Sequence, residues 1–127
     1  MRIDPRSHVP IYLQIAEEVR SAVAAGLYRP GEALPSLRAM AIDVKVNPNT
    51  VQRAYDELER EGLVYSQRGK GLFVADQGTT SAQTLTQAAV RRALEEGIRA
   101  ARAAGMSASQ VRGIFEAAIE GMAQVGS

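Results

Sequence analysis

The stretch that decides the fold is VNPNTVQRAYDELEREG, residues 46–62. Asn47 is a typical N-cap, because its side-chain oxygen can accept hydrogen bonds from the amides exposed at a helix start, and Pro48 suits the first helical position. Apolar residues then recur on one helical face, and Gly62 can end the helix in the left-handed conformation. The sequence therefore predicts a helix over 48–61. Its buried side would consist of Val51, Ala54, Tyr55 and Leu58.

The opposite side of this helix carries side chains that can read DNA bases. Asn49, Gln52 and Arg53 lie near its N-terminal end, which is the part of a recognition helix that reaches base edges. Arginine can donate two parallel hydrogen bonds to guanine, while asparagine and glutamine can donate to and accept from adenine. Thr50 could bond a phosphate or contact a thymine methyl group. The alternative for Arg53 is ordinary surface charge, paired along the helix with Glu57.

A second, shorter helix is predicted just before this stretch. Ser36 is a natural N-cap, the helix would run to about Val44, and residues 43–46 would form a turn. Two helices joined by such a turn are typical of a helix-turn-helix, whose second helix enters the major groove. The hydroxyl of Ser36 and the free amides beside it would favour a phosphate, and Arg38 and Lys45 add positive charge. We expect these three residues to fix the register of the protein on DNA, and Arg38 could also contact a base.

Two short strands are predicted after the long helix, at 63–66 and 72–75, joined by a basic, glycine-rich tip. In this tip Arg68 and Lys70 flank Gly69, and glycine allows the backbone to approach a groove or a phosphate closely. We expect the hairpin to be a wing that contacts DNA through these three residues.

Residues 1–76 would thus form one winged helix-turn-helix domain. It opens with a helix that begins at Pro10 and stops at Gly26. The apolar stripe of this helix would contain Ile11, Ile15, Val19, Ala22 and Val23. The expected fold class is mainly α with a small β-hairpin wing, followed by a two-helix segment.

The composition changes after this domain. Residues 77–81 are polar and would form a linker, while residues 82–127 are alanine-rich and contain no proline. One helix is predicted over about 82–104, with Gly105 after its end. The last helix would begin with the capping-box spacing of Ser107–Gln110.

Each of the two tail helices has an apolar face. These faces could pack on the winged domain, pair across a dimer or enclose a small molecule. Two thin helices leave apolar surface exposed unless something covers it, and a polar linker separates them from the first domain, so a homodimer is favoured. Whether a small-molecule effector also binds stays open. The residues expected in the dimer interface are Val90, Leu94, Ile98, Val111, Ile114, Phe115, Ala118, Ile119 and Met122.

The composition excludes several classes of site. The chain has no cysteine and one histidine, His8, so disulfides, cysteine-based zinc sites and thiol nucleophiles are ruled out, and we expect neither an enzyme nor a cofactor. No segment is long enough to span a membrane and no signal sequence is seen, which predicts a cytoplasmic protein without membrane partners. The net charge of +1 means that any affinity for DNA must come from local clusters of positive charge.

Several of these motifs, in this order and spacing, resemble the GntR family of winged-helix regulators. Many GntR members carry Ser-Arg where this chain has Asn47-Pro48, and that arginine commonly contacts DNA. The absence of the arginine removes one expected base contact. The pattern Asn-Pro-Asn-Thr-Val resembles instead the YtrA-like branch, whose members have a short two-helix segment for dimerisation. The resemblance implies autoregulation beside transporter genes. The motifs are LPSLR (34–38), VNPNTV (46–51), AY (54–55), LE (58–59), EGL (61–63) and GKGLFV (69–74).

The sequence therefore predicts a transcription regulator, acting as a repressor, that binds a pseudo-palindromic double-stranded operator as a homodimer. The alternative is a winged helix that serves protein interactions and has no specific operator. Selection from a random DNA library separates the two, because the alternative yields no selected sequence and no dependence of binding on salt.

Overall fold

The computed structural model describes residues 1–126, with side chains described for residues 1–122. It contains two compact units, Met1–Gln87 and the part of the chain from Ala88 onward. The prediction of a mainly helical fold with one β hairpin is confirmed. The elements are α1 (Ile11–Ala24), α2 (Leu37–Val44), α3 (Pro48–Arg60), β1 (Val64–Gln67), β2 (Gly71–Val74), α4 (Gly78–Ala103) and α5 (Ala108–Gly126).

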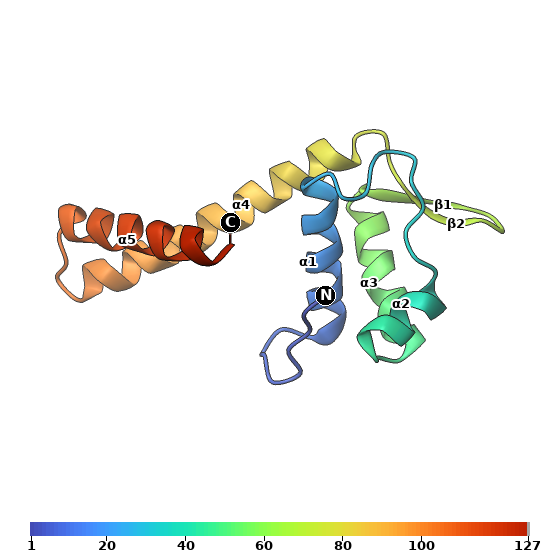
Figure 1. Cartoon of the computed structure of the whole chain (residues 1–127), viewed down its shortest axis with the longest axis horizontal. Coiled ribbons are helices and arrows are strands. Elements are labelled where there is room, and N and C mark those ends of the chain that lie inside the picture. The colour runs from blue at the N-terminus through green and yellow to red at the C-terminus, as the bar shows by residue number, and fades with distance from the viewer. Residues whose placement is uncertain (127) are drawn as a thin grey trace. The chain divides into compact units, whose positions relative to one another are not determined.

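The core of the first unit forms where α3 packs against α1, with α2 beside the start of α3 (Figure 1). The four apolar residues predicted for the inner face of α3 are all buried. They meet Ile15, Val19 and Val23 of α1, which are also buried. Because this face of α3 is committed to the core, its opposite face must point to solvent.

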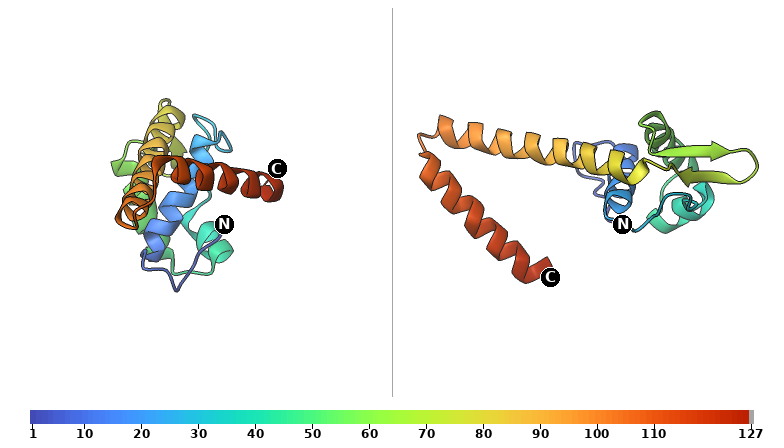
Figure 2. Two further views of the ribbon diagram at one scale, coloured as in Figure 1. Left: turned by 90° about the vertical axis from the view of Figure 1, so that its left-hand side faces the viewer. Right: turned by 90° about the horizontal axis from the view of Figure 1, so that it is seen from above.

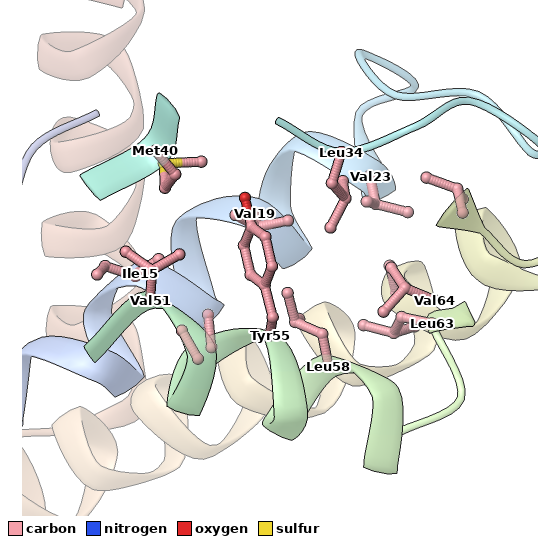
Figure 3. Close-up of a cluster of buried hydrophobic side chains, with 14 of the residues drawn as sticks. Ile15, Val19, Val23, Leu34, Met40, Val51, Tyr55, Leu58, Leu63 and Val64 are labelled. Carbon is pink, nitrogen blue, oxygen red and sulfur yellow. The ribbon is translucent and has the colours of Figure 1, made fainter. Parts of the chain in front are cut away.

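Tyr55 of α3 occupies the middle of the buried cluster (Figure 3). Its hydroxyl donates a hydrogen bond of 2.9 Å to the carbonyl oxygen of Pro35, just before α2. Burial, with a smaller contribution from Tyr28, raises the pKa of this hydroxyl well above its ordinary value, so it remains a donor. The bond therefore fixes the start of α2 relative to α3.

The two helices of the helix-turn-helix begin as the sequence predicts. The hydroxyl of Ser36 accepts a hydrogen bond of 3.0 Å from the amide of Ala39, and the side-chain oxygen of Asn47 accepts one of 2.8 Å from the amide of Asn49. Between the helices, Lys45 caps α2 in the left-handed conformation with φ 58°, an uncommon position for a residue other than glycine. The turn between α2 and α3 is therefore sharply defined.

The wing is an antiparallel hairpin in which Val64 faces Val74 and Gln67 faces Gly71. The segment around Ala33 adds an edge to it, because the amide of Leu34 donates to the carbonyl of Leu72 at 2.9 Å. The sequence pattern did not predict this third segment. It attaches the hairpin to the chain that leads into α2.

One expectation is wrong at the end of the first unit. The predicted linker 77–81 is helical from Gly78 onward, and Ala82, expected to open the dimerisation segment, is buried in the core of the first unit. A Cβ atom on Gly78 would lie 2.7 Å from the carbonyl oxygen of Leu63, so only glycine permits this close packing. Tertiary contacts thus extend α4 into a stretch whose polar composition suggests a loop.

The second unit is an αα-hairpin whose connection matches the prediction. Gly105 has φ 79°, and Ser107 and Gln110 form a reciprocal capping box. From this connection α5 diverges from the adjoining part of α4 (Figure 2). Of the nine residues expected in the dimer interface, Val111 is half-buried in the single chain. The others are exposed: Val90, Leu94, Ile98, Ile114, Phe115, Ala118, Ile119 and Met122.

The substitution Tyr55→Phe tests the bond between α3 and the start of α2. We expect it to lower the free energy of unfolding by about 1 kcal/mol, because the ring stays buried while one partly buried hydrogen bond is lost. Urea unfolding followed by circular dichroism measures the change. Tyr65→Phe, on the exposed side of β1, is the matched control and should leave the midpoint unchanged; equal effects of the two would contradict the assignment.

Candidate nucleic-acid interface

The outward face of α3 presents the three side chains predicted to read bases. Asn49, Gln52 and Arg53 are exposed, and Thr50 is half-buried. Because Gln52 and Arg53 are consecutive, they leave the helix in directions about 100° apart, one toward the wing and the other toward α1. The face therefore offers amide and guanidinium groups over a broad surface.

A cleft of about 560 Å³ lies between the start of α2, the outer side of α3 and the wing. Its floor includes Tyr55 and Leu34, and Glu59 contributes one carboxylate. The cleft brings together residues that are up to 38 positions apart in the chain, which sequence spacing alone could not show. The predicted DNA-binding residues that line it are Ser36, Arg38, Gln52, Arg68, Gly69 and Lys70.

The other predicted DNA-binding residues lie outside this cleft. Lys45 is exposed on the turn between α2 and α3, and Asn49 is exposed on the first turn of α3. Thr50 uses its amide to bond the carbonyl of Asn47, as expected for the first turn of a helix. Asn49 and Thr50 lie on the first turn of α3, the helix whose later turns line the cleft.

The wing is fixed to α3 at its base and carries its cations at its tip. The hydroxyl of Ser66 on β1 donates a hydrogen bond of 3.0 Å to the carboxylate of Glu59. At the tip, Gly69 has φ 76°, which glycine adopts without strain, between the exposed cations Arg68 and Lys70. This arrangement places two positive charges at the end of a supported hairpin.

Arg53 does not pair with Glu57, the alternative that the sequence offered. Its guanidinium carbon lies 4.0 Å from the centroid of the Tyr12 ring, and Glu57 pairs instead with Arg60. Tyr12 is half-buried and packs against the core, so its ring is a firm support for the cation. The stacking uses the face of the guanidinium and leaves N–H donors at its edge.

Gln52 also has a partner on its own helix. Its side-chain Nε2 donates a hydrogen bond of 2.8 Å to the carboxylate of Asp56, one turn later. Both side chains are exposed. The amide of Gln52 is therefore held in one orientation before any ligand binds.

Ion pairs remove some of the acidic charge from this surface. Glu61, at the far end of α3, receives two hydrogen bonds from the guanidinium of Arg20 on α1, one of them at 2.9 Å. Glu57 is paired with Arg60. The cations Arg38, Arg68 and Lys70 form no ion pair with the described residues, so the cleft keeps positive charge although the chain is nearly neutral.

Residues 11–74 match the profile of the family described as "Bacterial regulatory proteins, gntR family". The chain belongs to the GntR family. It is 38% identical to the HTH-type transcriptional repressor YtrA of Bacillus subtilis, over 84% of this chain and 82% of that protein. This GntR-family chain is therefore a DNA-binding transcription regulator with a winged helix, of the YtrA type that its motifs indicate.

Two solved structures extend the comparison. A GntR family transcriptional regulator from Listeria monocytogenes superposes with a TM-score of 0.80 at 28% identity, covering 90% of this chain and 97% of that one. The DNA-binding domain of AraR, solved in complex with an operator, gives a TM-score of 0.54 at 31% identity, covering 59% of this chain and 93% of that one. Among residues 1–126 of this regulator, no helix combines the length and the apolarity that a membrane crossing requires.

Two residues of this surface escaped the sequence analysis. The contact of Tyr12 with Arg53 joins positions 41 apart, for which the sequence carries no signal. Asp56 was not singled out, although its spacing of four from Gln52 on a predicted helix is the signal that could have identified the pair.

The contact between Tyr12 and Arg53 predicts a coupled effect on DNA binding. Tyr12→Leu should weaken binding about two- to fivefold, because an exposed cation–π contact stabilises by about 0.5–1 kcal/mol and Leu preserves only the packing. Tyr12→Phe keeps the ring and should bind as the parent does. Fluorescence anisotropy with labelled duplex DNA measures both, and the loss should vanish in an Arg53→Ala background; an equal loss in both backgrounds would contradict the coupling.

Proposed function

We propose that this regulator binds a pseudo-palindromic operator as a homodimer and represses transcription by covering a promoter. The observation that carries the proposal is the cleft in which the start of α2, the outer face of α3 and the wing tip converge with unpaired cations. In this arrangement α3 enters the major groove. The wing tip then lies beside the neighbouring backbone or minor groove.

Base reading and positioning are divided among the residues of this surface. Asn49, Gln52 and Arg53 contact base edges, because they lie on the first turns of α3 and offer the donor and acceptor patterns that distinguish base pairs. The remaining residues hold phosphates and set the register. These are Ser36, Arg38, Lys45, Thr50, Arg68, Gly69 and Lys70.

The apolar faces of α4 and α5 pair with those of a second chain. In a single chain Ile114 is 58% exposed and Met122 is 75% exposed, which is costly for large apolar side chains in water. A two-fold symmetric pairing covers them and presents two recognition helices to half-sites about one helical turn apart. The AraR domain solved with an operator supports the binding of duplex DNA by the first unit.

In vitro selection of bound duplex DNA, followed by footprinting, tests the proposal most directly. We expect one enriched motif with two inverted half-sites, protected on one face of the duplex, and affinity that falls steeply as salt rises. A library that shows neither enrichment nor dependence on salt would favour a protein-interaction module instead.

Two alanine variants separate base reading from positioning. Arg53→Ala should relax the preference at one base pair of each half-site, since a bidentate contact discriminates by about 1–3 kcal/mol. Lys70→Ala should weaken specific and scrambled DNA alike and reduce the salt slope by about one. Titrations of both variants against the selected operator and a scrambled duplex distinguish these outcomes; equal losses on the two duplexes for Arg53→Ala would remove it from the base-reading set.

A charge on the apolar face of α5 should separate the two chains. Ile119→Asp is expected to give a monomer in analytical ultracentrifugation, because a buried unpaired carboxylate is strongly unfavourable. Its affinity for the operator should fall about 100-fold or more, since the two half-sites are then bound independently. Ala117→Asp, on the opposite face of α5, is the matched control; a dimeric Ile119→Asp would refute this interface.

A further inference from the structure

Two carboxylates face outward on the recognition helix, where their negative charge opposes DNA binding. Asp56 and Glu59 are both exposed on α3, where Asp56 contacts Gln52 and Glu59 contacts Ser66 of the wing. A negative charge beside the phosphate backbone weakens binding to every DNA sequence. The bond from Ser66 gives Glu59 a role in supporting the wing, which leaves Asp56 without a role.

Asp56 is not held by a cation within the part of the chain that the structure describes. Arg60, one turn further along α3, pairs with Glu57, and Arg53 lies over the ring of Tyr12. The contact that Asp56 makes is the hydrogen bond of 2.8 Å from the Nε2 atom of Gln52. Gln52 is therefore the side chain on which Asp56 acts directly.

The chemistry of the pair fixes which way round the Gln52 amide lies. An ionised carboxylate accepts hydrogen bonds and cannot donate one, so it must face the NH₂ end of the amide and not the oxygen. One N–H of Nε2 is then engaged with Asp56. The other N–H and the oxygen Oε1 remain for a ligand, and within the described residues Oε1 accepts no hydrogen bond.

We propose that Asp56 is a positioning residue that holds Gln52 in the orientation that reads adenine. Adenine presents an acceptor and a donor side by side in the major groove, and they match an N–H and an oxygen of one amide. The inference rests on the proposed function, because it takes Gln52 to face a base. The negative charge of Asp56 lowers affinity for all DNA, and the fixed amide raises the difference between adenine and other bases.

The experiment measures base preference separately from affinity. The base pair read by Gln52 is first located as the operator position whose preference disappears in Gln52→Ala. Asp56→Asn is then titrated against the operator with an A·T pair and with a G·C pair at that position. The amide of Asn can donate as well as accept, so Gln52 can turn over, and the preference for A·T should fall about two- to fivefold. Affinity for both duplexes should rise, because a negative charge has been removed.

Two further variants exclude a general effect of charge or helix stability. Asp43→Asn, at an exposed position of α2, removes the same charge and should leave the preference at that base pair unchanged. Asp56→Glu keeps an acceptor-only group and should retain most of the preference. Circular dichroism confirms that each variant is folded.

The outcomes distinguish this inference from the proposed function. If the parent chain selects no operator, the proposed function fails and the inference fails with it. If the parent selects an operator but Gln52→Ala alters no position, or Asp56→Asn keeps the full preference, the inference is overturned while operator binding stands.

Discussion

The arrangement of the helix-turn-helix depends on the hydrogen bond between Tyr55 and the carbonyl of Pro35. The phenol ring is buried in the middle of the core, and its hydroxyl reaches the residue before the Ser36 cap. One side chain therefore fixes the recognition helix within the hydrophobic interior and the start of α2 against it. Together with Met40 and Ala41 of α2, which are buried in the same core, this bond places the amides and cations at that start beside α3.

The side chains of the outward face are prepared for binding before DNA arrives. Arg53 lies over Tyr12, Gln52 is bonded to Asp56, and the wing is tied to α3 through Ser66 and Glu59. Each long side chain that is immobilised on binding costs about 0.5–1.5 kcal/mol of conformational entropy. Contacts made within the free protein reduce that cost, and they restrict the geometry in which each donor is presented to a ligand.

The local signals of the sequence predicted most of the first unit. Asn47 and Pro48 marked the start of α3, and the spacing of Val51, Ala54, Tyr55 and Leu58 identified its buried face, because capping and periodicity depend on near neighbours. Each predicted strand begins and ends one residue away from the observed strand. This shift is ordinary at the ends of short elements.

The features that were missed depend on residues distant in the chain. The edge segment around Ala33 forms because β2 lies beside it, and the start of α4 packs closely on Leu63 because Gly78 has no side chain. Likewise, the stacking of Arg53 on Tyr12 requires α1 and α3 to be packed together first. Such contacts follow from the assembled core, which no sequence window contains.

The left-handed backbone conformation of Lys45 lowers the stability of the turn between α2 and α3. An L-residue in this region costs about 1–2 kcal/mol relative to its favoured conformations, whereas glycine adopts it freely. Glycine would thus favour a more stable turn between α2 and α3, but it would bring no ammonium group to this edge of the binding surface. A locally strained lysine at this turn agrees with the phosphate contact that we propose for it, because backbone strain is commonly retained where a side chain serves a ligand.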